Sequence, residues 1–187
     1  EPFEEIAKED TIDDSDKKII KILKNSIIFE DENILVINKP SGIACQGGIG
    51  IKQSVDRLMN FAYDNKLKIV HRIDKDTSGL LVLAKNLKYS QLLTKLFREK
   101  KIEKTYYCLS TKSSEIESYM TSKFVDQILE KKDVLIKAPL GIKIVSEQEK
   151  VRVDFESKFS AETKIKLVKQ AKNDLFFFEV QPKTGRK

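Results

Sequence analysis

Residues 71–84 read HRIDKDTSGLLVLA, and this run holds the side chains best suited to chemistry. It contains the only histidine of the chain, His71, and a carboxylate, Asp74, on a polar turn directly before an apolar segment. Charged side chains are seldom buried unless they are paired or functional, so this many of them beside a core strand indicates a site. A carboxylate there is a candidate nucleophile, and the alternative is a turn or N-cap carboxylate without chemistry. We therefore interpret the run as a candidate active site.

Metal and kinase chemistry find little support in the other residues. The two cysteines, Cys45 and Cys108, are far apart, and the sequence has no second histidine and no CxxC, so it predicts no metal site. Both cysteines are expected to be small core or near-core residues of a cytosolic protein. His71-Arg72 also begins like the His-Arg-Asp loop of protein kinases, but Ile73 occupies the aspartate position and a glycine-rich ATP loop is missing.

The composition predicts a soluble globular protein with a positive charge. Of its 187 residues, 40% are hydrophobic and 34% are charged, and the net charge is +6 at pH 7. This excess suits an anionic partner, although many enzymes without such a partner share it. No apolar stretch approaches the roughly 18 residues of a membrane span, and the acidic N-terminus lacks the apolar core of a signal peptide. We expect a cytoplasmic protein without membrane contact.

Short strands and a few helices must position the run. Apolar periodicity predicts helices over residues 16–23, 52–65 and 87–100, the last with Leu92, Leu93, Leu96 and Phe97 inward and basic residues outward. Strands are predicted over residues 27–29, 34–37, 80–84, 104–110, 164–168 and 175–180, with an edge strand over 151–153. Residues 111–150 are rich in lysine and glutamate and weakly patterned. These elements predict an α+β fold with a mixed, largely antiparallel sheet flanked by helices.

Four motifs follow one another from residue 34 towards the end of the sequence. They are ILVINKPSG at residues 34–42, HRIDKDTSGL at 71–80, KTY at 104–106 and PKTGR at 182–186. In this order and rough spacing they resemble the motifs of RluA-type pseudouridine synthases, and the catalytic motif at 71–80 agrees almost letter for letter. The segment APL at residues 138–140 is similar to the RluC subgroup, which acts on 23S ribosomal RNA.

The resemblance implies an isomerase that acts on RNA and needs neither a cofactor nor a metal. Pseudouridine synthesis breaks the N1–C1′ glycosidic bond of a uridine, rotates the uracil and rejoins it through C5. A nucleophile in an apolar, water-poor pocket suits this chemistry, because water would trap the intermediate. The implied partner is large-subunit ribosomal RNA, and the protein is expected to be a monomer. Two alternatives stay open: a synthase that acts on transfer RNA and a non-catalytic RNA-binding remnant.

The resemblance also gives individual residues a role. It implies that Asp74 is the catalytic nucleophile, that Arg72 enters the space of the flipped nucleotide and that Tyr106 lies against the uracil. Further candidates for substrate binding are His71, Lys39 and Arg186. For these three the sequence leaves plainer alternatives open, which are hydrogen bonds within the loop, a structural lysine and the end of a strand.

The two ends of the sequence depart from the family pattern. The family continues after the TGR motif into a His-Gln-(Ile/Leu)-Arg segment, and a later arginine or lysine partners the catalytic aspartate, whereas this sequence ends at Lys187. RluC-type proteins also carry an N-terminal S4 RNA-binding domain, and residues 1–25 resemble the linker that follows it. We therefore expect an N-terminal arm at residues 1–25 and a catalytic domain at residues 26–187 that lacks its C-terminal part.

Overall fold

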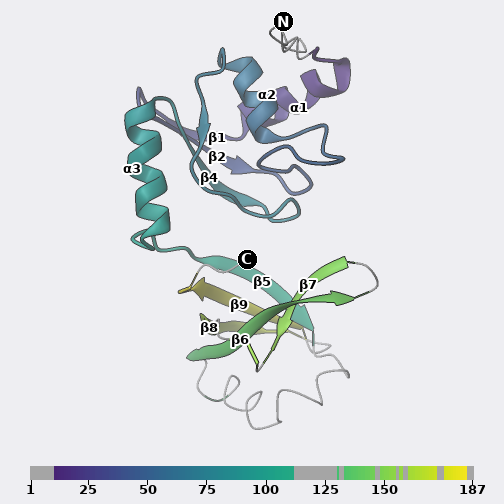
Figure 1. The fold of residues 1–187 in the computed structure, drawn as a ribbon, viewed down its shortest axis with the longest axis vertical. Coiled ribbons are helices and arrows are strands. Elements are labelled where there is room, and N and C mark those ends of the chain that lie inside the picture. The colour runs from purple at the N-terminus through teal and green to yellow at the C-terminus, as the bar shows by residue number, and fades with distance from the viewer. Residues whose placement is uncertain are drawn as a thin grey trace, which may run out of the picture. The chain divides into compact units, whose positions relative to one another are not determined.

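Two compact units, Glu1–Glu99 and Lys100–Lys187, make up the computed structural model of the chain (Figure 1). The structure describes residues 11–111, 130, 133–145, 148–154, 156–157, 160–171 and 175–184. Each unit has a β-sheet of its own.

The first unit contains a four-stranded antiparallel sheet in the order β1-β2-β4-β3. Its strands are β1 (Ile27–Glu30), β2 (Ile34–Lys39), β3 (Lys68–Ile69) and β4 (Gly79–Ala84). Leu81 and Leu83 on β4 are fully buried, whereas Leu80 is 62% exposed, as expected for a strand with one covered face. The strands predicted over residues 27–29, 34–37 and 80–84 are therefore confirmed. β3 is too short for a pattern to predict it.

Three helices are described in the first unit, namely α1 (Asp14–Asn25), α2 (Val55–Ala62) and α3 (Leu87–Arg98). Each begins after a polar N-cap whose side chain accepts a backbone N–H: Asp13 from Asp16, Ser54 from Arg57 and Asn86 from Tyr89. The α1 helix packs on α2, and α3 packs against β3 and β4. The three predicted helices are confirmed, with most of their ends moved by two or three residues.

The α3 helix is less buried than its sequence predicts. Leu92, which we expected to face inward, is 46% exposed, whereas Leu93, Leu96 and Phe97 are half-buried. Because β3 has only two residues, the sheet offers α3 a narrow surface. That surface covers one i, i+3, i+4 stripe and leaves Leu92 outside it.

The second unit contains a five-stranded antiparallel sheet in the order β5-β9-β8-β6-β7. Its strands are β5 (Tyr106–Thr111), β6 (Asp133–Val145), β7 (Gln148–Val153), β8 (Ser160–Gln170) and β9 (Leu175–Pro182). They confirm the four strands predicted in this part of the chain, and β7 lies at an edge as expected. Leu167 on β8 and Phe176 on β9 are buried.

The β6 strand is an element that the sequence did not predict. It lies in the weakly patterned stretch 111–150, and its Pro139 is a residue that a central strand normally excludes. Residues 133–139 pair with β8 and residues 140–145 pair with β7, so Pro139 stands where the partner changes. The proline is tolerated because the ladder is interrupted there in any case.

The fold class is α+β, as predicted. Among the described residues the strands pair in the antiparallel sense, and parallel pairing is limited to a single bridge between Ala44 and Ser54. The boundary predicted after residue 25 stays a prediction, while the two compact units divide after Glu99. None of the helices in the described part of the chain has the length and apolarity to cross a membrane.

Candidate active site

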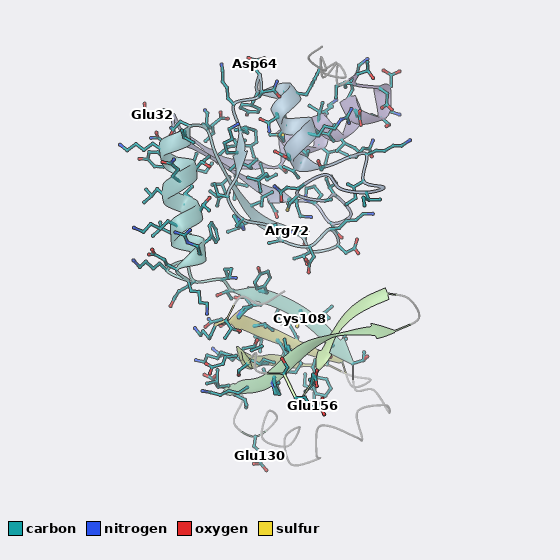
Figure 2. The ribbon with its side chains drawn as sticks, viewed as in Figure 1. Glu32, Asp64, Arg72, Cys108, Glu130 and Glu156 are labelled. Carbon is teal, nitrogen blue, oxygen red and sulfur yellow. The ribbon has the colours of Figure 1, made fainter. Side chains whose placement is uncertain are left out.

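The aspartate turn, residues 73–77, leads from the buried Ile73 towards β4 and presents Asp74 to solvent. The backbone N–H of Thr77 donates to the carbonyl oxygen of Asp74 over 3.1 Å and closes the turn. Arg72 (labelled in Figure 2) and Asp74 are exposed, and Ile73 between them is buried. The β4 strand then begins at Gly79, whose φ of +127° is strained for any residue with a side chain.

A second turn, residues 39–43, supports the aspartate turn through its backbone. The N–H of Gly42 donates to the carbonyl oxygen of Lys75 over 2.9 Å. The hydroxyl of Ser41 donates to the carbonyl oxygen of Asp76 over 2.8 Å. The Lys39 ammonium donates to the same Lys75 carbonyl over 3.0 Å. Three hydrogen bonds therefore join this support turn to the two residues that follow Asp74, and they fix its position on the sheet.

Lys39 is the largest fully buried side chain in the described part of the chain. Besides the Lys75 bond, its ammonium donates to the carbonyl oxygens of Pro40 over 2.9 Å and of Ile43 over 2.8 Å. An ammonium has three donors, so these bonds use all of them. Burial lowers the pKa of Lys39, while the nearby Cys45, Asp76 and Asp74 act in the opposite direction. This environment favours the structural alternative for Lys39 over a contact with substrate phosphate.

The two cysteines differ in their surroundings. Cys45 is buried, and its thiol donates to the carbonyl oxygen of Ile73 over 3.2 Å, so it also holds the start of the aspartate turn. Cys108 lies on β5 and is exposed, and our expectation of a core or near-core position is wrong for it. The error arises because Cys108 lies on an edge strand. The presence of a small apolar residue on such a strand does not tell which face of the sheet is covered.

His71 is half-buried and ties the start of the motif to the sheet. Its Nε2 accepts the backbone N–H of Val82 over 2.9 Å, and its ring stacks on Phe97 of α3 with the centroids 4.1 Å apart and 18° between the planes. The β3 strand ends at Ile69 and pairs with β4 only as far as Leu83. The imidazole therefore accepts the Val82 N–H where a longer β3 would supply a backbone carbonyl. This hydrogen bond joins His71 to β4, outside its own loop, and the predicted contact of His71 with substrate stays a prediction.

The remaining two candidates belong to the second unit. Tyr106 is half-buried at the start of β5, where it pairs with Val180 of β9. Its predicted contact with uracil stays a prediction. Arg186 lies outside the described residues. No group of three or more histidine, cysteine, aspartate or glutamate side chains in the described ranges is arranged to hold a metal ion.

Two supporting residues, Ser41 and Cys45, were not predicted from the sequence. Both act on backbone carbonyls of the aspartate turn. The turn sequence Pro-Ser-Gly predicts a bend, but the carbonyls that it contacts lie about 30 residues further along the chain. The arrangement presents the exposed Asp74 carboxylate on a hydrogen-bonded turn whose Lys75 and Asp76 are exposed too. An exposed carboxylate on a fixed backbone suits nucleophilic attack on a bound substrate.

Comparisons with known proteins identify relatives of this chain. The family model described as RNA pseudouridylate synthase matches residues 33–187. A ribosomal large subunit pseudouridine synthase C of Rickettsia bellii is 36% identical over 168 residues, covering 89% of this chain and 51% of the relative. The protein of the same name from Buchnera aphidicola (Schizaphis graminum) is 38% identical over 170 residues, with 89% and 48% covered. The chain thus spans about half the length of these curated relatives.

The fold also occurs in a solved structure. The structure of human RNA Pseudouridylate Synthase Domain Containing 4 has a TM-score of 0.64 and 23% sequence identity, and the match covers 92% of this chain and 64% of that one. At this identity the match supports the fold alone.

Proposed function

The chain belongs to the RNA pseudouridylate synthase family, and on that basis we propose that it converts specific uridines of 23S ribosomal RNA to pseudouridine, with Asp74 as the nucleophile. The observation that carries this proposal is the exposed Asp74 carboxylate on a turn that three hydrogen bonds fix to the support turn. The relatives named for the ribosomal large subunit support the choice of RNA. We further propose that the protein acts as a cytoplasmic monomer.

The reaction is an isomerisation, so its atoms balance without a co-reactant. The N1–C1′ bond of the uridine breaks, the uracil rotates and the C5–C1′ bond forms, while C5 loses a proton and N1 gains one. The Asp74 carboxylate attacks C1′ or C6 and later leaves, or it takes a proton from the ribose. In each route a carboxylate held on a fixed backbone approaches the substrate without first being ordered, which saves part of the entropic barrier.

Arg72 is proposed to hold the place of the extracted nucleotide. Removing a base from a stack costs a few kcal/mol, and a side chain that fills the gap recovers part of this free energy. The exposure of both Arg72 and Asp74, with the buried Ile73 between them, supports this role. Tyr106 is proposed to stack on the uracil, where an aromatic ring contributes about 1–3 kcal/mol.

The test compares the full chain with its Asp74→Asn variant on 23S ribosomal RNA that carries tritium at C5 of its uridines. Loss of the C5 proton releases tritium to water, and we expect Asp74→Asn to lower the rate by at least about 10³-fold. Equal release by both proteins would overturn the assignment. Release from transfer RNA alone would select the transfer RNA alternative, and salt-dependent RNA binding without release would select the non-catalytic remnant.

A further inference from the structure

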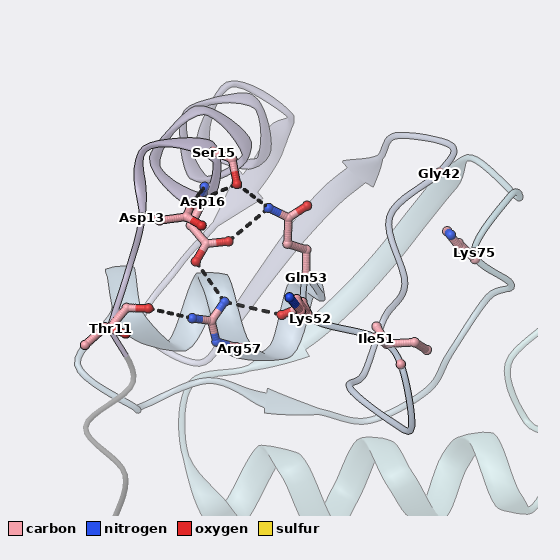
Figure 3. A pocket seen from close by; sticks show the side chains of 11 residues that line it. Thr11, Asp13, Ser15, Asp16, Gly42, Ile51, Lys52, Gln53, Arg57 and Lys75 are labelled. Atoms are coloured by element: carbon pink, nitrogen blue, oxygen red, sulfur yellow. Dashed lines mark hydrogen bonds and ion pairs between the residues drawn. The ribbon is translucent and has the colours of Figure 1, made fainter.

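A hollow of about 810 Å³ opens in the first unit next to the aspartate turn (Figure 3). Its walls come from the start of α1, from residues 50–57 and from Gly42 and Lys75, where the support turn meets the aspartate turn. This volume lies in the range of small-molecule sites and is large enough for one nucleotide. The function proposed above uses Asp74 and leaves the hollow without a role.

The wall at α1 is pre-formed by a hydrogen-bonded cluster. The Arg57 guanidinium pairs with the buried Asp16 carboxylate over 2.9 Å, and the Gln53 amide donates to Asp16 over 3.0 Å and to Ser15 over 2.8 Å. Burial acts to raise the pKa of Asp16, but the hydrogen bonds from Gln53 and Arg57 outweigh it and hold that pKa below its usual value. The cluster therefore keeps its shape without a ligand.

Two further lining residues, Lys52 and Lys75, have ammonium groups that could bind a ligand. Figure 3 places Lys52 and Lys75 on opposite sides of the hollow, and both are exposed. Among the described residues, neither ammonium has a hydrogen bond or an ion pair. Asp13 brings a negative charge at the α1 end, where it accepts from the N–H of Asp16 over 2.8 Å and from the hydroxyl of Ser15 over 2.7 Å. An anionic group thus fits between the two lysines, and a group with donors fits beside Asp13.

We propose that the hollow binds one nucleotide of the RNA strand next to the target uridine, with its phosphate between Lys52 and Lys75 and its nucleoside towards α1. Lys75 directly follows Asp74, and consecutive Cα atoms are about 3.8 Å apart. Because Lys75 lines the hollow and the exposed Asp74 precedes it on the same turn, a strand that delivers a uridine to Asp74 passes close to the hollow. This subsite rests on the proposed function, and it would fix the register of the RNA on the enzyme.

The first experiment measures RNA binding without turnover, in the Asp74→Asn background. The probe is the 23S fragment modified in the tritium assay or, without turnover, the fragment that binds most tightly. We expect Lys52→Gln to weaken binding roughly three- to tenfold at moderate salt. The slope of log K against log salt should fall by about 0.7, the value for one phosphate of a single strand. Lys21→Gln is the matched control on α1 outside the hollow, and it should change affinity by less than twofold.

The second experiment identifies the phosphate. Fragments with a neutral methylphosphonate at single positions around the target uridine are tested for binding to two proteins, one with Lys52 intact and one with Lys52→Gln. At one position next to the uridine the neutral linkage should weaken binding by the protein with Lys52 intact and leave binding by Lys52→Gln unchanged, since both changes remove the same contact. Independent effects at every position would overturn the proposal.

Two further outcomes separate the subsite from its alternatives. Binding of free uridine monophosphate that depends on Lys52, together with an RNA affinity that Lys52→Gln leaves unchanged, would overturn the proposal in favour of a free nucleotide in the hollow. Both experiments measure binding and do not depend on turnover. If the unsubstituted protein releases no tritium but the methylphosphonate and Lys52→Gln still remove the same contact, the proposed function is refuted and the subsite is not.

Discussion

At the residue scale, Lys39 uses a buried charge to build the site. Removing a cation from water is costly unless hydrogen bonds replace the lost hydration, and here three carbonyl oxygens do so. Two of them belong to the support turn and the third to Lys75, so one side chain joins the two turns. A neutral side chain of similar length fills the same space without joining anything.

Lys39→Met should therefore destabilise the protein and disturb the aspartate turn. The Lys75 carbonyl keeps its bond from Gly42, but the carbonyls of Pro40 and Ile43 lose their donor, so we expect the free energy of unfolding to fall by about 2–4 kcal/mol. Urea denaturation measures this change. Lys66→Met replaces a lysine that is 71% exposed and should cost less than about 0.5 kcal/mol. Equal stability of both variants would refute the structural role of Lys39.

His71 offers a second residue-scale prediction, because its two contacts can be separated. His71→Phe keeps an aromatic ring for Phe97 and removes the acceptor for the Val82 N–H. An unsatisfied buried donor costs about 1–3 kcal/mol, which urea denaturation should detect. His71→Gln removes the ring but offers an amide oxygen to the Val82 N–H, and it should recover part of the lost stability. If both variants are as stable as the unsubstituted protein, the hydrogen bond contributes nothing.

At the element scale, the sequence predicts the helices and most strands because apolar periodicity is local. The candidates Asp74 and Arg72 were named from a short motif and its resemblance to a known family, and their roles stay proposals. The sequence does not reveal what holds that motif, because Ser41, Cys45 and Lys39 contact backbone carbonyls, and every residue type has a carbonyl. The β6 strand was missed for a related reason, since its proline is tolerated only where the pairing partner changes.

The ion pair between Asp16 of α1 and Arg57 of α2 predicts that the protein loses stability at acid pH. The pKa of Asp16 is held below its usual 3.8, so its contribution to stability is present above pH 3.8 and is lost as the pH falls through the lower folded-state value. Asp16→Asn should therefore flatten the fall in unfolding free energy below about pH 4 and reduce stability at pH 7. Urea denaturation between about pH 2 and pH 7 tests this, with Asp64→Asn on an exposed turn as the control. Parallel pH curves for Asp16→Asn and the unsubstituted protein would contradict the ion pair with Arg57.

At the scale of the whole molecule, the candidate residues are divided between the two units. Asp74, Arg72, His71 and Lys39 all lie in the first unit, and Tyr106 lies in the second. The motif order in the sequence predicted that these residues serve one reaction, but a sequence does not state where one compact unit ends. The aspartate turn and the hollow lie in the first unit, and Tyr106, whose stacking on uracil is a proposal, lies in the second.

The net charge of +6 gives the last prediction, which concerns affinity for RNA as distinct from choice of RNA. Lys88 and Arg98 are exposed at the two ends of α3, away from the aspartate turn in sequence and without a described ion pair. If they contact phosphates, the double variant Lys88→Gln/Arg98→Gln should lower the salt slope by about 1.4, twice the single-strand value per phosphate.

That loss should be uniform across ribosomal and transfer RNA, because phosphate contacts carry no sequence information. Filter binding at several salt concentrations measures both slopes, with Lys66→Gln as the control for a lysine outside α3. A loss confined to one RNA would mean that α3 reads a feature of that RNA. An unchanged slope would mean that the basic face of α3 is merely solvated, and the RNA affinity of this chain would then depend on other cations, including Lys52 and Lys75.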